Sequence, residues 1–265
     1  MSAGRLSFAH RAGENVHGHW LLAHLGKQVL RPGGIELTHA LLDRTSLTGA
    51  DVVELAPGRG WTAAEVVARE PRSYHGVDRD AEAARRVRPI VQKWGDVRTA
   101  EAARTGLPDA SADVVLGEAL LTLQSDRGKA AIVEEAVRLL RPGGRYAIHE
   151  LGLTPDTLTD EIKSDVRQAL AHTVKVNARP LTSAEWTELL TEHGLVVDHI
   201  ETAPMALLQP GRLIADEGLR GATRFAANLL AHPPARKRVL AMRKTFRTHR
   251  AHLMAVALVA HKPEG

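Results

Sequence analysis

The feature that most constrains the fold is a regular alternation of short apolar runs with helical segments between residues 51 and 150. Continuous apolar runs such as Val52-Val53 and Val114-Val115-Leu116 are typical of strands that are buried on both faces. Strands that alternate with helices in this way indicate βαβ crossovers and a parallel sheet. We predict strands over 51–55, 74–77, 90–94, 113–117 and 145–150, and helices over 61–69, 80–88 and 127–140.

Helical segments flank this alternation on both sides. Apolar positions between residues 10 and 30 have helical spacing, and a second helix is predicted over 36–43. After the fifth strand, we predict helices over 157–176 and 233–250 and strands over 195–200 and 252–261, with a capping box at Thr182-Ser183-Ala184-Glu185. The predicted fold class is therefore α/β, a doubly wound, mostly parallel, Rossmann-like sheet of seven strands that ends in an antiparallel strand.

The chain length favours a single domain. Its predicted parts are an N-terminal helical extension or lid (1–50), a core (51–202), a helical insertion (203–250) and the last strand (251–265).

Composition excludes several classes of chemistry. The 265 residues contain no cysteine, which excludes disulfides, thiolate metal sites and a cysteine nucleophile. The net charge is only +4, so binding to nucleic acid is not implied. No apolar run is long enough to span a membrane, and we expect a soluble, cytoplasmic protein. The cluster His17-Gly18-His19-Trp20 has no carboxylate or cysteine partner at a fixed spacing, so we predict no metal site.

A glycine turn follows the first predicted strand and indicates a bound cofactor. Gly58-Arg59-Gly60-Trp61-Thr62-Ala63 fits the dinucleotide pattern, and Asp78 lies 18 residues after Gly60, where a ribose-binding acid belongs. A nicotinamide-dependent oxidoreductase is therefore one interpretation. Glu54, just before the turn, would repel a diphosphate and attract a cofactor that carries an ammonium and a sulfonium group.

These features occur in a joint order with Leu-Arg-Pro-Gly-Gly at 140–144 and a helical start ahead of the first strand. In this order, residues 36–200 resemble the class I S-adenosylmethionine-dependent methyltransferases, particularly the small-molecule group related to ubiquinone and menaquinone methyltransferases. The resemblance implies S-adenosyl-L-methionine as the cofactor. It departs from the family at Ala56-Pro57, where proline stiffens the turn and removes one backbone donor.

The resemblance also implies a role for individual residues. Glu54 and the backbone of the turn, at Ala56, Gly58 and Gly60, would lie near the methionine part of the cofactor. Asp78 would hold the ribose hydroxyls. The further positions that it implies are Asp96 at the adenine amino group, Val97 against the ring and Glu118 at the methionine end and substrate mouth.

Each acid also has a purely structural interpretation. Glu54 could cap a helix N-terminus or pair with an arginine, Asp78 could cap the helix that begins near Asp80, and Asp96 could be a turn residue. His149 and Glu150, at the end of the fifth strand, are the candidates for orienting or deprotonating a substrate. Alternatively, these two side chains hydrogen-bond neighbouring loops.

The last predicted helix is strongly basic. Arg236, Lys237, Arg238, Arg243, Lys244, Arg247 and Arg250 surround an apolar stripe of Val239, Met242 and Phe246. Such a helix could attract an acidic partner, an anionic substrate or a membrane surface, or it could simply be solvated. The predicted function is S-adenosylmethionine-dependent methyl transfer to a small organic molecule. A nicotinamide-dependent oxidoreductase and a noncatalytic binding protein on the same fold are the alternatives.

Overall fold

The protein, seen here as a computed structural model, is described at residues 21, 22, 25, 32–175, 177–205, 208 and 210–264. The histidine cluster at 17–19 lies outside these residues, as does the helix predicted over 10–30 except for Leu21, Leu22 and Leu25. Within the described residues, one sheet has the strand order β3-β2-β1-β4-β5-β8-β7. β8 is antiparallel to both of its neighbours, and the other pairs on this path are parallel.

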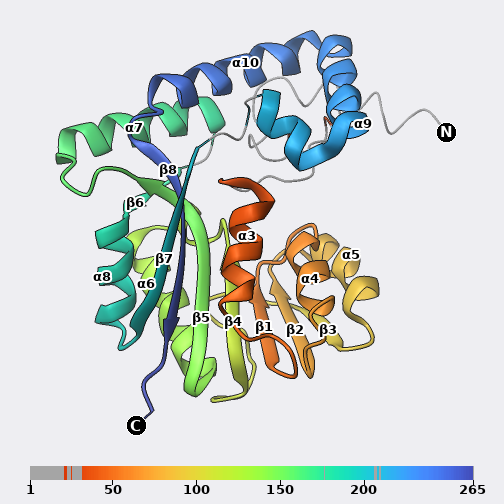
Figure 1. Cartoon of the computed structure of the whole chain (residues 1–265), viewed down its shortest axis with the longest axis vertical. Helices are drawn as coiled ribbons and strands as arrows, with labels where there is room; N and C mark the ends of the chain where they lie inside the picture. The colour runs from red at the N-terminus through yellow and green to blue at the C-terminus, as the bar shows by residue number, and fades with distance from the viewer. Residues whose placement is uncertain are drawn as a thin grey trace.

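The predicted α/β class with its antiparallel last strand is confirmed (Figure 1). The strands are β1 Asp51–Leu55, β2 Ser73–Asp78, β3 Gly95–Thr99, β4 Ala112–Glu118, β5 Leu140–Leu153, β7 Val196–Pro204 and β8 Leu253–His261, with the two-residue β6 Leu181–Thr182 beside β5. The helices are α3 Gly34–Asp43, α4 Trp61–Val67, α5 Ala81–Val91, α6 Asp126–Leu139, α7 Asp160–Val174, α8 Ser183–Glu192, α9 Pro210–Ala231 and α10 Pro233–Thr248, and η1 Leu121–Leu123 is a short 3-10 helix.

Apolar side chains cover both faces of the sheet. One layer includes Leu41 of α3 and Val66 of α4, and the opposite layer includes Val133 of α6 and Trp186 of α8. The predicted capping box is present, because Thr182 and Glu185 exchange side-chain to backbone hydrogen bonds at the start of α8. The sheet is therefore doubly wound, as its continuous apolar strands predicted.

The strand predicted over 90–94 is wrong. The first of these residues end α5, and β3 begins only at Gly95. Val87 and Val91, four residues apart, are fully buried on one side of α5, and the helix continues through Pro89 between them. The apolar residues that suggested a strand therefore belong to a helical stripe.

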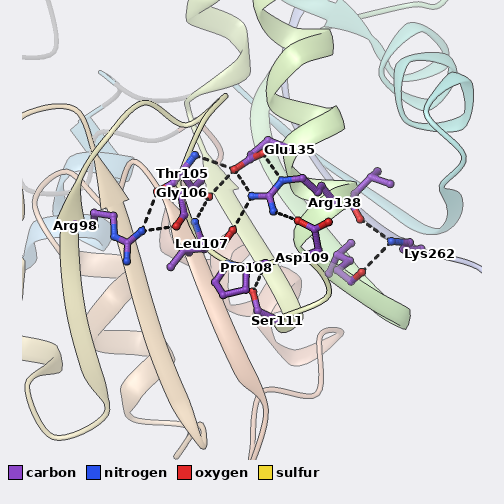
Figure 2. Close-up of polar contacts among 12 residues, drawn as sticks. Arg98, Thr105, Gly106, Leu107, Pro108, Asp109, Ser111, Glu135, Arg138 and Lys262 are labelled. Carbon is purple, nitrogen blue, oxygen red and sulfur yellow. Dashed lines mark hydrogen bonds and ion pairs between the residues drawn. The ribbon is translucent and has the colours of Figure 1, made fainter.

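The connection from β3 to β4 is fastened to α6 by polar contacts (Figure 2). The backbone N–H and the hydroxyl of Thr105 donate to Glu135, and Arg138 donates to Glu135, to Asp109 and to the carbonyl of Leu107. The Arg138 guanidinium lowers the pKa of Glu135 to about 2, further helped by the bonds from Thr105. This network fixes the loop that leads into β4, whose far end carries Glu118.

A helical cap lies beyond the carboxyl ends of the parallel strands. α7, α9 and α10 form it, and Figure 1 shows α10 across the top of the molecule with α9 beside it, while the C-terminus leaves at the opposite end. Its own apolar cluster includes Leu170 of α7, Phe225 of α9 and Met242 of α10. The insertion predicted over 203–250 is thus largely α9 and α10.

Candidate functional site

A cavity of about 470 Å³ lies between the carboxyl ends of the strands and the helical cap. Its floor lies at the ends of β1, β2 and β4 and contains the carboxylates of Glu54, Asp78 and Glu118 together with the turn residues Ala56, Pro57 and Gly58. Arg59, Arg79 and Arg86 also line the cavity. Its roof consists of apolar residues, among them Leu151, Leu170, Val174, Met205, Met242 and Phe246. The cavity therefore has one wall with charged, hydrogen-bonding side chains and one apolar wall.

Glu54 lies on β1 and is held by a tyrosine. Tyr74 on the neighbouring β2 donates its hydroxyl to Glu54 Oε2 at 2.6 Å. Burial, together with the charge of Glu54, raises the pKa of Tyr74 well above its usual value, so the hydroxyl remains a donor. Sequence reasoning missed Tyr74, and the only available signal was a tyrosine on the strand next to the acid.

The two glycines of the turn have different surroundings. Both have positive φ, 56° at Gly58 and 78° at Gly60. Gly58 lines the cavity, and a Cβ there would meet only the carbonyl of Ala56, at 3.7 Å. A Cβ at Gly60 would lie 2.7 Å from Ile90 Cδ1 and 3.1 Å from Val87 Cγ2, both on α5. Gly58 therefore permits approach to the cavity, whereas the missing Cβ of Gly60 makes room for α5. That the backbone of Gly60 lies near the cofactor stays a prediction.

Asp78 ends β2 and faces the cavity. Its carboxylate accepts the backbone N–H of Gly58 at 3.0 Å and that of Asp80 at 2.9 Å. A carboxylate offers about four lone pairs, so it can still accept hydroxyl groups of a ligand. The cap of α5 is Asp80, whose side chain accepts from Glu82 N, and Asp78 is free of that structural role.

Asp96 and Val97 do not reach the cavity, contrary to the sequence-based expectation. Asp96 is the second residue of β3 and not its end, its side chain is 68% exposed, and it accepts from Arg88 Nε at 2.8 Å. Val97 is fully buried in the layer beneath α5. The carboxyl end of β3 is Thr99, which is paired with Asp78. Because the third strand was predicted too early in the chain, Asp96 was wrongly expected at its carboxyl end.

Glu118, at the end of β4, contacts three polar side chains from other elements. Its Oε1 accepts from Thr38 Oγ1 at 2.7 Å and lies 2.9 Å from His149 Nδ1, while its Oε2 accepts from Thr62 Oγ1. Thr38 and Thr62 come from α3 and α4, and sequence reasoning named neither. These contacts hold the carboxylate at the boundary between floor and roof.

His149 does not line the cavity, but its ring contacts the carboxylate of Glu118, which does. The side chain is fully buried, and its Nε2 lies 2.6 Å from the carbonyl oxygen of Pro32, which can only accept. Nε2 therefore carries a proton. Nδ1 lies 2.9 Å from Glu118 Oε1 and 3.3 Å from Thr38 Oγ1, so His149 joins the backbone of Pro32 to the polar groups at the end of β4.

Glu150 is also absent from the cavity lining. Its carboxylate accepts the backbone N–H groups of Leu120, Leu121 and Thr122 and the hydroxyl of Thr122. Complete burial raises its pKa, and these bonds oppose that effect. Glu150 thus holds the loop after β4, and the structure supports the alternative that His149 and Glu150 bond neighbouring segments over direct contact with a substrate.

The predicted apolar stripe of the basic helix faces inward. Met242 and Phe246 of α10 line the cavity, and Val239 is buried in the cap beside them. Among the described residues, no group of three or more histidines and acids is arranged to hold a metal ion. The same part of the chain contains no helix long and apolar enough to cross a membrane.

Residues 52–144 match the family described as "Methyltransferase domain". A Haemophilus influenzae protein, named only as uncharacterized, is 30% identical over 247 residues, which cover 90% of this chain and 96% of that protein. A Mycolicibacterium smegmatis protein named "Probable S-adenosylmethionine-dependent methyltransferase" is 34% identical over 57% of this chain and 53% of its own length.

The fold is also similar to that of a solved structure with a bound cofactor product. Phosphoethanolamine N-methyltransferase 2 from Haemonchus contortus, in complex with phosphomonomethylethanolamine and S-adenosylhomocysteine, superposes with a TM-score of 0.68. The similarity covers 93% of this chain and 57% of that one, at 19% identity. At this identity the likeness concerns the fold.

Proposed function

Because the chain belongs to the class I S-adenosylmethionine-dependent methyltransferases, we propose that the floor of the cavity binds the cofactor and that the roof binds a small organic acceptor. The cofactor is S-adenosyl-L-methionine, which supplies a methyl group activated on a sulfonium sulfur. The observation that carries the assignment of the two walls is their chemical contrast within one cavity.

The residues of the floor fit this cofactor. Asp78 has lone pairs free for two ribose hydroxyls, and Gly58 leaves open space for close approach to its backbone. Glu54 and Glu118 place two carboxylates in the same wall, which favours an ammonium or sulfonium group beside them, whereas Arg59, Arg79 and Arg86 also line the cavity. We propose these four residues as the cofactor site, without Asp96 or Val97.

Glu118 is proposed as a fixed negative charge beside the reacting groups. Thr38, Thr62 and His149 all contact its carboxylate, so its position is set before any ligand enters. His149 is then a positioning residue, and it links Glu118 to the backbone of Pro32. The chain's main contribution is to align acceptor and donor, as an in-line displacement requires.

The acceptor is proposed to be largely apolar. The roof offers leucine, valine, methionine and phenylalanine side chains from β5, α7 and α10, and these can discriminate by shape but not by charge. A small apolar body with one nucleophilic atom directed toward Glu118 fits this arrangement. The cytoplasmic location expected from the sequence, and an acidic partner at the basic helix, stay predictions.

Ligand-dependent melting followed by methyl transfer tests the proposal. S-adenosylhomocysteine at about 100 times its dissociation constant should stabilise the fold by roughly 2.7 kcal/mol, and NAD should have no effect. Incubation with methyl-labelled cofactor and a panel of apolar phenols, amines and acids should then label at least one acceptor. Stabilisation by NAD alone would favour an oxidoreductase, and cofactor binding without any labelled acceptor would favour a noncatalytic protein.

A further inference from the structure

Basic charge is concentrated in the last part of the chain. No aspartate or glutamate occurs between residues 218 and 263, although the whole chain has a net charge of only +4. This segment contains ten basic residues: Arg220, Arg224, Arg236, Lys237, Arg238, Arg243, Lys244, Arg247, Arg250 and Lys262. The remainder of the chain consequently has more acidic than basic side chains.

α10 has two distinct faces. Ala235, Val239, Met242 and Phe246 are buried in the cap. On the exposed side, Arg236, Arg243 and Arg247 are spaced so that they share one stripe with Leu240, which is 51% exposed. A large apolar side chain thus lies in the middle of a basic surface.

α9 adds to the same cap an exposed stripe that contains two leucines. Leu219, Thr223, Ala226 and Leu230 recur at intervals of three and four residues and are all exposed, with Leu219 at 71% and Leu230 at 68%. Arg220 and Arg224 flank this stripe. Both helices lie at the end of the molecule opposite the C-terminus (Figure 1), and α9 packs against α10.

We propose that the outer surface of α9 and α10 docks on an anionic lipid bilayer. Basic side chains attract anionic headgroups, and exposed leucines gain free energy when they enter the interface. A nucleic acid would require only the positive charge, whereas a bilayer interface offers anionic headgroups to the basic side chains and acyl chains to the protruding leucines. An acidic protein partner is the alternative outcome of the test. Binding would be peripheral, and it would place the bilayer against the helix whose inner face lines the cavity.

Co-flotation with vesicles tests this proposal without any acceptor or turnover. The full chain should float with phosphatidylcholine vesicles that contain about 30% phosphatidylglycerol, should not float with phosphatidylcholine alone, and should be released by high salt. Replacement of Arg236, Arg243 and Arg247 by Gln should weaken binding roughly 100-fold, since each basic residue contributes about a fivefold factor. Leu230→Gln with Leu240→Gln should weaken it roughly tenfold.

Matched controls remove the same groups elsewhere. Arg85, Lys93 and Arg127 are exposed basic residues outside the cap, and their replacement by Gln should leave vesicle binding unchanged. Val196→Gln with Ile200→Gln, on the exposed side of β7, is the control for the leucines. Circular dichroism confirms that each variant is folded.

Three results would overturn the proposal. They are failure of the wild type to float with anionic vesicles, equal weakening by the control charge variant, and vesicle binding that is unaffected by the leucine substitutions. In the last case, release of the protein from the vesicles by polyglutamate would point to an acidic protein partner. Because flotation is scored without methyl transfer, none of these results bears on the proposed reaction.

Discussion

The floor and the roof of the cavity differ in how their residues are fixed. On the floor, Glu54, Asp78 and Glu118 already accept hydrogen bonds from the protein, so their oxygens have set directions. In the roof, Leu170 and Phe246 are held only by apolar packing. Directional bonds suit one invariant ligand, whereas an apolar wall tolerates exchange of side chains of similar volume. The comparison explains how one fold can keep its cofactor and change its acceptor.

The largest expected effect separates the two glycines of the turn after β1. Gly60→Val should destabilise the fold by roughly 3–5 kcal/mol, because the side chain collides with Val87 and Ile90 and positive φ disfavours a β-branched residue. Gly58→Val carries only the backbone strain, about 1–2 kcal/mol, but it should abolish binding of S-adenosylhomocysteine. Urea unfolding and calorimetry measure the two effects. Greater destabilisation by Gly58→Val would contradict the assignment.

The second prediction concerns Glu135, which holds the loop that leads into β4, and uses low pH to protonate its carboxylate. The pKa of Glu135 is about 2 in the fold, below the ordinary value of 4.5, so its ionised form stabilises the fold at neutral pH. A lowered pKa means that this contribution is complete above about pH 4.5 and is lost as the pH falls toward 2. In urea unfolding, Glu135→Gln should therefore be less stable than the wild type at pH 7, with a smaller difference at pH 3.

The roof supplies the control for that titration. Phe246→Leu changes only apolar packing, so its stability relative to the wild type should be the same at pH 7 and pH 3. The opposite result would be a stability difference between Glu135→Gln and the wild type that is the same at pH 7 and pH 3, with a Phe246→Leu difference that becomes smaller at pH 3. It would mean that the roof and not the floor depends on ionised groups, which contradicts the contrast between the two walls.

The sequence predicted the floor better than it predicted the interactions behind it. Glu54 and Asp78 were found because they end strands next to a glycine turn, a local pattern. Tyr74, Thr38 and Thr62 were missed because their contacts join separate elements of the fold. Asp96 was misplaced because the helical stripe of α5 was interpreted as a strand, which moved the predicted edge of the sheet.

His149 and Glu150 show a second limit of local reasoning. Both residues occur where β5 passes the carboxyl ends of the neighbouring strands, so their position suggested contact with a substrate. Their burial depends on Pro32 and on the loop at 120–122, which are distant in sequence. The inward stripe of α10 was predictable because its spacing alone defines one face of the helix.

The third prediction tests the floor itself with a pair of aspartates. Asp78→Ala should weaken binding of S-adenosylhomocysteine by about 1.5–3 kcal/mol, because it removes a charged acceptor that faces the cavity. Asp96→Ala is the matched control, since it deletes the same group from an exposed ion pair, and its affinity should equal that of the wild type. Calorimetry on both folded variants decides; equal losses would mean that proximity to the cavity does not determine binding.

The smallest expected effect concerns the roof and separates acceptor from cofactor. Phe246 of α10 is buried and lines the cavity. The substitution Phe246→Leu keeps an apolar side chain there and changes the shape of the wall. The affinity for S-adenosylhomocysteine should change by less than about 0.5 kcal/mol, because no floor contact is removed. The KM of a labelled acceptor should change severalfold, since a change in size of an apolar pocket is worth about 1–3 kcal/mol at most. The reverse result, with a large loss of cofactor affinity and an unchanged KM, would place the cofactor beneath α10 and invert the assignment of the two walls.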